Sequence, residues 1–220
     1  MGATTLVVGG DGGIGRACVE EFEGAGHRIV VVDRARGHDA CDPDLVRRLI
    51  ADAGPLDNVV HAAGSVGSGG IGDEGPEQWR RVLEDNLVSA MAVSQAVVPA
   101  LRDGASVVLF GSVNGRHGGN RLSGPAYAAA KAGIAGLARH LAKDLAPRGI
   151  RVNTVAPGPV RTPMVDRLTQ DQTRDLLAGV PLGRMTAARE IAGTVAWLCS
   201  PSAASVTGAV IDVNGGMWMG

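Results

Sequence analysis

Apolar runs alternate with amphipathic stretches along the whole chain. Apolar runs typical of strands buried on both faces of a sheet occupy residues 4–8, 28–33, 56–64, 105–112, 151–158 and 208–216. Stretches with helical spacing of apolar residues occupy residues 14–26, 42–54, 76–101, 124–146, 165–178 and 187–199. This alternation predicts an α/β fold: a single doubly wound (Rossmann) domain over residues 1–220, with a parallel seven-stranded sheet and helices on both faces.

The connection after the second apolar run is short. The few residues between Asp33 and Asp39 cannot form a full crossover helix. Either this crossover is reduced to a loop, or the strand expected around residues 39–41 is vestigial.

Composition narrows the class of protein. Hydrophobic residues make up 45% of the chain and aromatic residues 3%, so the core must consist of Val, Leu, Ile and Ala. The net charge is −1 and there is no basic run, which argues against nucleic acid and membranes as partners. The three cysteines (Cys18, Cys41 and Cys199) lack metal-ligand spacing, and the first residues lack a signal-peptide pattern. We therefore expect a cytoplasmic protein with reduced thiols and no metal site.

The first apolar run leads into a glycine-rich segment, "VVGGDGGIGRA" at residues 7–17, and then into a helix. Two glycine patterns overlap here, G-x-G-x-x-G and G-x-x-x-G-x-G. They are formed by Gly10, Gly12 and Gly15, and by Gly9, Gly13 and Gly15. Without Cβ atoms the backbone can turn tightly and approach a pyrophosphate, while the helix N-terminus offers free N–H groups and the positive end of its dipole. Strand, loop and helix together predict dinucleotide binding.

The residue that ends the second apolar run indicates which dinucleotide binds. Asp33 lies 18 residues past Gly15, where a carboxylate can accept hydrogen bonds from both ribose hydroxyls of the adenosine half. The same carboxylate repels the 2′-phosphate of NADP, and Asp11 adds a second negative charge nearby. Arg34 is the counter-argument, because it can pair with a phosphate. Two acids against one arginine favour NAD over NADP.

The single tyrosine of the chain stands in "GPAYAAAKAG", residues 124–133. If this segment is helical, Tyr127 and Lys131 lie one turn apart on the same face. Interconversion of an alcohol and a ketone by a nicotinamide needs a proton carrier, and an unperturbed phenol is a poor base at neutral pH. The Lys131 ammonium and the positively charged nicotinamide both favour phenolate. Ser112, at the carboxyl end of a predicted strand, is placed to hydrogen-bond the substrate oxygen.

These residues resemble the classical short-chain dehydrogenases/reductases, and the resemblance extends over essentially the whole chain in the order of that family's motifs. The segment "DNL" (85–87) is similar to the one whose asparagine joins the lysine to bulk water. The resemblance therefore implies four catalytic residues: Ser112, Tyr127, Lys131 and Asn86. The segments "DACD" (39–42), "HAAG" (61–64) and "NTVAPGPVRTPM" (153–164) resemble further parts of the family's cofactor site. The implied cofactor site consists of Gly9, Asp11, Gly13, Ile14, Gly15, Asp33, Asp39, Ala40, Ala62, Ala63, Gly64, Tyr127, Lys131, Pro157, Gly158, Val160 and Thr162.

The sequence departs from the family pattern in four places, the first of which is Val8, where threonine is usual. His61 and Ala62 replace two asparagines that help to stabilise the sheet. Ser112 and Tyr127 are slightly farther apart than is usual, which indicates an insertion around residues 117–121. The short connection after the second apolar run removes part of the wall of the adenosine pocket. None of these departures changes the identity of the proton carrier.

We therefore expect an NAD(H)-dependent oxidoreductase that interconverts a secondary alcohol and a ketone under a substrate lid at about residues 160–185. Two alternatives remain open: an NADPH-dependent ketoreductase, and a non-catalytic dinucleotide-binding regulator of the same fold. Catalysis is favoured because all four polar positions are filled. The resemblance also implies a homo-oligomer, a dimer or tetramer, joined through the long helices at 76–101 and 124–146 and the C-terminal strand region. The sequence does not identify the small-molecule substrate.

Overall fold

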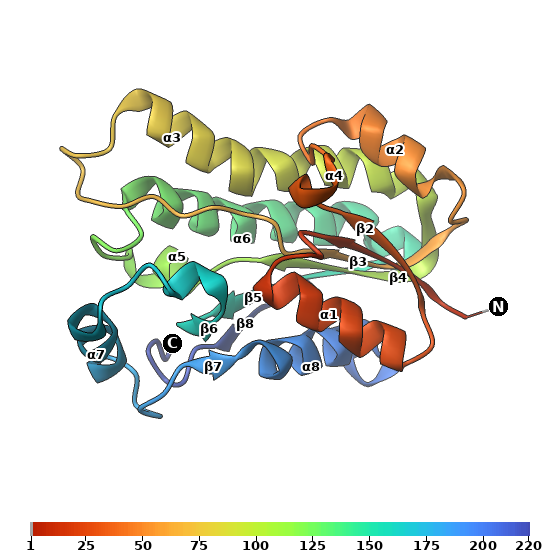
Figure 1. The fold of residues 1–220 in the computed structure, drawn as a ribbon. Helices are drawn as coiled ribbons and strands as arrows, with labels where there is room; N and C mark the ends of the chain where they lie inside the picture. Colours follow the sequence, from red (N-terminus) through yellow and green to blue (C-terminus); the bar gives the residue numbers. More distant parts are fainter. Residues whose placement is uncertain (1) are drawn as a thin grey trace.

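Six parallel strands form the central sheet of the computed structural model, which describes residues 2–220 (Figure 1). The strand order is β2-β1-β3-β4-β5-β8, and every neighbouring pair is parallel. The strands are β1 (Thr4–Val8), β2 (Arg28–Val32), β3 (Leu56–His61), β4 (Leu101–Phe110), β5 (Arg151–Pro157) and β8 (Val210–Val213). The doubly wound α/β fold predicted from the alternation of apolar runs and amphipathic stretches is confirmed.

The prediction of a seventh strand in this sheet is wrong. β2 is an edge strand, and the chain after it forms the 3-10 turn η1 (Arg34–Arg36) and the helix α2 (Pro43–Ala51) with no strand between them. Asp33 caps η1 by accepting a hydrogen bond from Ala35 N at 2.8 Å, and Gly37 adopts a left-handed conformation with φ 76°. The chain therefore turns away from the sheet edge at once, and the crossover to β3 runs through η1 and α2.

A separate two-stranded sheet follows β5. β6 (Val160–Arg161) and β7 (Thr186–Ala187) pair in parallel, and the chain between them forms η5 (Pro163–Val165) and α7 (Gln170–Ala178). This excursion coincides with the segment predicted as a lid at about residues 160–185. In Figure 1 it lies at the edge of the molecule, beside the C-terminus.

Helices cover both faces of the six-stranded sheet (Figure 1). α1 (Gly13–Gly24) and α8 (Ala188–Cys199) pack against each other on one face. α2, α4 (Ser89–Val97) and α6 (Pro125–Leu145) cover the other. None of the helices within residues 2–220 is long and apolar enough to cross a membrane.

Two apolar cores lie on opposite sides of the sheet, and strand alternation divides residues between them. In β1, Leu6 packs into the core beneath α4 and α6, whereas its neighbour Val7 packs into the core beneath α1 and α8. Ile134 and Ile191 supply helix side chains to the first and the second core, and both are completely buried. Most of the buried side chains in both cores are Val, Leu, Ile and Ala, as the composition predicts.

The helix predicted over residues 76–101 contains an irregularity at its centre. It consists of α3 (Pro76–Leu83), the π-helical segment η2 (Glu84–Val88), α4 and the 3-10 turn η3 (Val98–Ala100). π-helical turns inside α-helices occur frequently at functional sites, because they redirect the side chains around them. Here the π-helical segment contains Asn86.

Candidate functional site

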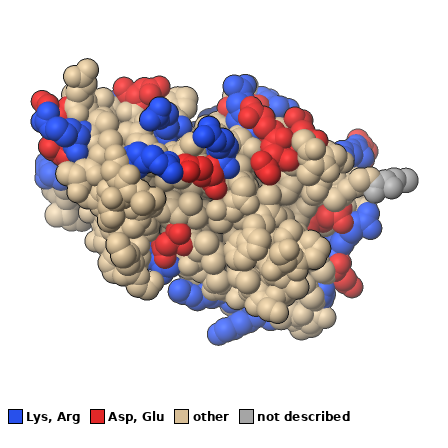
Figure 2. All heavy atoms as spheres, turned by 90° about the horizontal axis from the view of Figure 1, so that it is seen from below, with Lys and Arg blue, Asp and Glu red and all other residues tan. Residues whose placement is uncertain are grey.

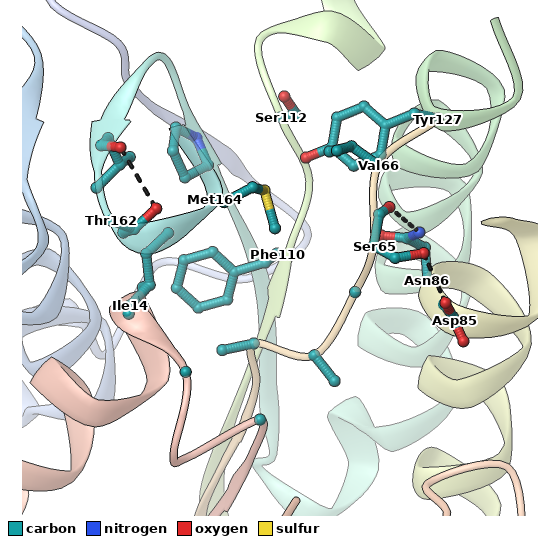
Figure 3. Close-up of a pocket in the computed structure, with 18 of the residues that line it drawn as sticks. Ile14, Ser65, Val66, Asp85, Asn86, Phe110, Ser112, Tyr127, Thr162 and Met164 are labelled. Atoms are coloured by element: carbon teal, nitrogen blue, oxygen red, sulfur yellow. Dashed lines mark hydrogen bonds between the residues drawn. The ribbon is translucent and has the colours of Figure 1, made fainter. Parts of the chain in front are cut away.

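A cleft of about 630 Å³ opens where the carboxyl ends of β1, β3, β4 and β5 meet at one edge of the sheet. Every residue that the sequence predicts for the site lines this cleft. Figure 3 shows the arrangement: Ile14 at the start of α1 and Thr162 after β6 lie on one side, and Ser112 and Tyr127 lie on the other. Ligands of open parallel sheets bind at this edge, so the position of the cleft agrees with the predicted site.

The glycine-rich turn between β1 and α1 depends on the absence of side chains. Gly9 has φ 81°, and a Cβ on Gly15 would lie 2.0 Å from the Gly9 carbonyl oxygen. A Cβ on Gly13 would lie 2.5 Å from Thr162 Cγ2, so the turn also packs tightly against the segment after β6. No side chain caps the N-terminus of α1, where Gly12 is the N-cap. The turn without side chains and the uncapped helix end fit a pyrophosphate, whose oxygens would accept hydrogen bonds from their N–H groups.

At the carboxyl end of β2 the backbone already holds the Asp33 carboxylate. Its two oxygens accept hydrogen bonds from Asp11 N at 3.0 Å and from Ala35 N at 2.8 Å. Arg36, which the sequence argument overlooked, forms two hydrogen bonds with the Asp11 carboxylate at 2.7 and 2.9 Å and lowers its pKa. The Asp11 carboxylate therefore stays ionised, but the positive charge of Arg36 compensates for its negative charge. Asp11 no longer supports the preference for NAD as a second repelling charge.

Arg34, which could pair with the 2′-phosphate of NADP, also forms an ion pair within the chain. Its Nη2 atom lies 2.6 Å from Asp85 Oδ1, and the Arg34 side chain is 77% exposed while the Asp85 side chain is 10% exposed. Asp85 also accepts a hydrogen bond from Ser65 Oγ at 2.6 Å (Figure 3). The sequence contains no signal for this connection, because the three residues lie far apart in the chain.

Ser112 follows β4 and is buried at the floor of the cleft. Its Oγ atom accepts a hydrogen bond from Asn114 N at 3.1 Å, at the start of the short helix α5 (Asn114–His117). Asn114 is held in turn by its Nδ2 atom, which donates to Ser123 Oγ at 2.8 Å. The Ser112 hydroxyl accepts this backbone hydrogen bond and can still donate its own hydrogen, either to the Tyr127 phenol or to a group in the cleft.

Tyr127 and Lys131 lie one turn apart in α6, as their spacing predicts. Lys131 Nζ lies 5.5 Å from the centre of the Tyr127 ring and donates a hydrogen bond to Phe110 O at 2.9 Å. Burial lowers the pKa of Lys131 to about 7. Burial also raises the pKa of Tyr127, while Ser112 and the charge of Arg167 act in the opposite direction. The expectation that Lys131 lowers the pKa of Tyr127 is therefore not met, because desolvation of the phenol outweighs the hydrogen bond from Ser112 and the charge of Arg167.

The side-chain oxygen of Asn86, Oδ1, is buried and accepts no hydrogen bond from any of the residues 2–220. The Nδ2 atom of Asn86 donates to Ser65 O and to Val82 O, both at 2.8 Å, but Oδ1 is unpaired. A Cβ on Gly64 would lie 2.3 Å from Asn86 Oδ1 and 3.4 Å from Lys131 Nζ. The missing side chain at Gly64 thus leaves space between an unpaired acceptor and a buried amine. Unpaired buried acceptors of this kind commonly mark places where a water binds.

His61 lies within reach of the charge of Lys131 and has a structural role. Burial lowers its pKa to about 3, so the ring is neutral at physiological pH. Its Nε2 atom lies 3.1 Å from Ser89 Oγ, which donates to Asp85 O at 2.9 Å within the π-helical turn. Residues 2–220 contain no cluster of three or more His, Cys, Asp or Glu side chains suited to a metal ion.

The charged side chains around the molecule are mixed in sign. On the face seen from below, acidic and basic side chains are interspersed among large uncharged areas (Figure 2). Many of them form ion pairs, such as Arg184 with Glu190 and Arg116 with Asp212. Pairing of this kind agrees with the net charge of −1.

The chain is similar to known proteins over nearly its whole length. Residues 39–218 match the family described as enoyl-(acyl carrier protein) reductase. The chain is 35% identical over 241 residues to 3-oxoacyl-[acyl-carrier-protein] reductase FabG of Escherichia coli (strain K12), with 99% of this chain and 98% of that protein covered. The chain belongs to the classical short-chain dehydrogenase/reductase family. The resemblance in the motifs is thereby confirmed, and the chain is an oxidoreductase of the class that uses a nicotinamide dinucleotide.

Solved structures of similar proteins share the fold of this short-chain dehydrogenase/reductase. A short-chain dehydrogenase/reductase from Brucella melitensis, described as a glucose/ribitol dehydrogenase, aligns with a TM-score of 0.93 and 31% identity over 99% of this chain and 97% of that chain. A blue fluorescent protein from a metagenomic library, solved in complex with NADPH, aligns with a TM-score of 0.88 and 29% identity over 99% and 98%.

The connection after β2 forms part of one wall of the cleft in this short-chain dehydrogenase/reductase. Asp39, Ala40 and Cys41 line the cleft from a turn before α2, and Cys41 N donates to Asp39 Oδ1 at 2.9 Å. The predicted insertion around residues 117–121 lies in the chain from α5 to α6, where Arg121 O accepts a hydrogen bond from Gly69 N at 2.8 Å. This second segment therefore packs against the loop that follows β3.

Proposed function

We propose that this short-chain dehydrogenase/reductase interconverts a ketone and a secondary alcohol, with Tyr127 as the acid/base and ketone reduction as the favoured direction. The observation that carries the proposal is the convergence of Ser112, Tyr127, Lys131 and Asn86 on one cleft that also contains the glycine-rich turn. The nicotinamide dinucleotide supplies the hydride when it is bound. The chain supplies the binding site, the orientation of the carbonyl group and the proton.

Ser112 and Tyr127 divide the work at the substrate oxygen. When a ketone binds, the Ser112 hydroxyl donates its hydrogen to the carbonyl oxygen, which places this oxygen beside the phenol and stabilises the negative charge that develops on it. Tyr127 then donates its proton. Because burial raises the pKa of Tyr127, the phenol stays protonated at neutral pH, which is the form that ketone reduction requires. The phenol thus has the protonation state that the reductive direction uses.

Lys131 and Asn86 return a proton to Tyr127 after each turnover. With a pKa of about 7, Lys131 can exchange a proton near neutral pH. A water held between Lys131 Nζ and the unpaired Asn86 Oδ1 would extend the route out of the cleft, past the space beside Gly64. Lys131 also holds α6 to the sheet through Phe110 O.

We propose NAD(H) as the cofactor, supported by the Asp33 carboxylate at the end of β2. Both arginines that follow it already pair with a carboxylate, Arg34 with Asp85 and Arg36 with Asp11, so a 2′-phosphate would have to compete with that carboxylate for either of them. NADPH is the second candidate. It is favoured by the exposure of Arg34 and by the similar blue fluorescent protein that was solved with NADPH.

The substrate half of the cleft supports a ketone with an apolar neighbour. Apolar side chains there come from the loop after β3, from the segment before α6, from the lid and from the C-terminal region: Val66, Leu122, Met164, Leu168, Leu176 and Met217. We propose a 3-oxoacyl thioester as the substrate class, which accords with the name of the Escherichia coli relative. We also propose that the chain forms a homo-oligomer, because Val88 and Met91 expose apolar surface along the long helix.

One assay tests the function. The purified chain is mixed with NADH or NADPH and either a 3-oxoacyl thioester or a simple ketone, and oxidation of the cofactor is followed by absorbance. Turnover with NADH, faster with the thioester than with the ketone, is the expected result. Cofactor binding without turnover of either substrate would instead support the non-catalytic regulator. Lower KM for NADPH than for NADH would reverse the cofactor assignment.

A further inference from the structure

Two charged side chains are buried among residues 2–220, and the proposed reaction uses one of them. Lys131 and Glu74 are each 6% exposed. Lys131 lines the cleft, whereas Glu74 does not and lies in the loop between β3 and α3. Burying a carboxylate costs free energy unless hydrogen bonds compensate for the lost water. The contacts of Glu74 therefore indicate what it does.

Three donors surround the Glu74 carboxylate. Its Oε2 atom accepts a hydrogen bond from Ala126 N at 3.0 Å. Its Oε1 atom accepts from Ser68 N at 3.2 Å and from Gln78 Nε2 at 3.3 Å. The site is also shaped for this group, because a Cβ on Gly67 or on Gly124 would lie 1.9 Å from Oε1. Two glycines thus leave the space that the carboxylate fills.

The contact with Ala126 places Glu74 at the N-terminus of the helix that carries Tyr127 and Lys131. Gly124, the N-cap of α6, has no side chain to accept the free N–H groups of the first turn, and Pro125 occupies the first helical position. Glu74 supplies the missing acceptor from 52 residues away, and its negative charge lies at the positive end of the helix dipole. Tyr127 is the next residue after Ala126.

The same loop is joined to the segment between Ser112 and Tyr127. Gly69 N donates to Arg121 O at 2.8 Å, and Arg121 Nη2 lies 2.6 Å from Asp73 Oδ2. The loop also lines the cleft through Ser65 and Val66 (Figure 3). A shift of this loop would therefore reach both the substrate side of the cleft and the first turn of α6.

We propose that Glu74 is a positioning residue that holds the first turn of α6, and with it the Tyr127 phenol, in register with the loop at residues 65–75. This inference rests on the proposed role of Tyr127. Glu74 touches neither the phenol nor the cleft. It acts through the backbone at Ala126, so its loss should reduce turnover without weakening cofactor binding at the distant glycine-rich turn.

Three variants and one control separate the positioning of α6 by Glu74 from the effect of the negative charge of Glu74. Glu74→Ala removes all the hydrogen bonds, and Glu74→Gln keeps one acceptor oxygen. Gly67→Ala leaves the carboxylate charge in place but forces Oε1 out of its position. Glu77→Gln is the matched control, since Glu77 lies at the start of α3 with its side chain 90% exposed. All are measured as full-length protein for kcat, KM and cofactor Kd.

The expected kcat falls about threefold in Glu74→Gln and tenfold or more in Glu74→Ala and Gly67→Ala, while the cofactor Kd changes less than twofold. A second readout needs no turnover. Tyr127 is the only tyrosine, so ¹³C-tyrosine labelling gives a single phenol resonance. In Glu74→Ala and Gly67→Ala the pKa of this phenol should move down toward its ordinary value of about 10, because burial is what raises it.

Three results would contradict either the positioning role of Glu74 or the proposed function. Glu74→Gln and Gly67→Ala variants that match Glu77→Gln in both kcat and the phenol resonance would overturn the inference, even if Glu74→Ala failed to fold. A parallel loss of cofactor affinity and kcat would also overturn it, since that pattern indicates general loosening of the fold. A wild-type chain without turnover would refute the proposed function, and the phenol resonance would still test the role of Glu74.

Discussion

Replacing Lys131 with methionine should make the cofactor-free chain more stable while removing its activity. Lys131 is 6% exposed, and the only cause of its lowered pKa is burial. Methionine has nearly the same length and no charge to desolvate. The hydrogen bond to Phe110 O is lost, which costs about 1 kcal/mol. The burial of the ammonium costs more than that.

The free-energy cost of burying the Lys131 ammonium follows from the pKa of this group. Its ordinary value is 10.5 and its value in the folded chain is about 7, so between these values the unfolded chain binds more protons than the folded chain. Stability therefore rises with pH across this window, and the full cost is present below about pH 7. The gap of 3.5 in pKa corresponds to about 5 kcal/mol at most. Between about pH 7 and about pH 9 the wild-type chain should gain about 2 kcal/mol relative to Lys131→Met.

Urea unfolding at a series of pH values measures this difference directly. Subtracting the wild-type curve from the variant curve cancels every other titrating group that the two chains share. Lys143→Met is the matched control, because Lys143 lies on the same helix and is exposed. Lys131→Met should be about 3 kcal/mol more stable near pH 7, with the advantage shrinking as pH rises. A constant difference across the pH range would refute the reasoning, since it would mean that the buried amine does not titrate with a lowered pKa.

Three further predictions concern the cleft. Tyr127→Phe should lower kcat by about 10²- to 10⁴-fold with an unchanged cofactor Kd, as expected for loss of a general acid; unaltered turnover in this variant contradicts the mechanism. Gly13→Ala should weaken cofactor binding, because the new Cβ would lie 2.5 Å from Thr162 Cγ2, and calorimetric titration with the cofactor measures the loss. Asp33→Ala should improve the affinity for NADPH relative to NADH by about tenfold, because one carboxylate that repels the 2′-phosphate is gone; an unchanged ratio argues that Asp33 does not select the cofactor.

The amino-acid sequence by itself determined the layered fold and a set of site residues that all line the cleft. Strand and helix periods are local properties, so the alternation of apolar runs with amphipathic stretches was sufficient to predict the parallel sheet. The four-residue spacing of Tyr127 and Lys131 was sufficient to place them on one face of α6. The carboxyl ends of parallel strands lie at one edge of a sheet, so Gly9 after β1 and Ser112 after β4 were expected at the same edge, and both line the cleft.

Only the tertiary structure decided the number of strands and the electrostatics of the cleft. The missing seventh strand depends on how η1 turns the chain away from the edge of the sheet, and the pairing of Arg36 with Asp11 follows from that turn. Desolvation raises the pKa of Tyr127 and lowers that of Lys131, and burial cannot be read from their spacing. The hydrogen bond from Ala126 to Glu74 joins residues 52 positions apart. Periodicity reports how neighbouring residues face a core, whereas burial and contacts over such separations exist only once the whole chain has packed.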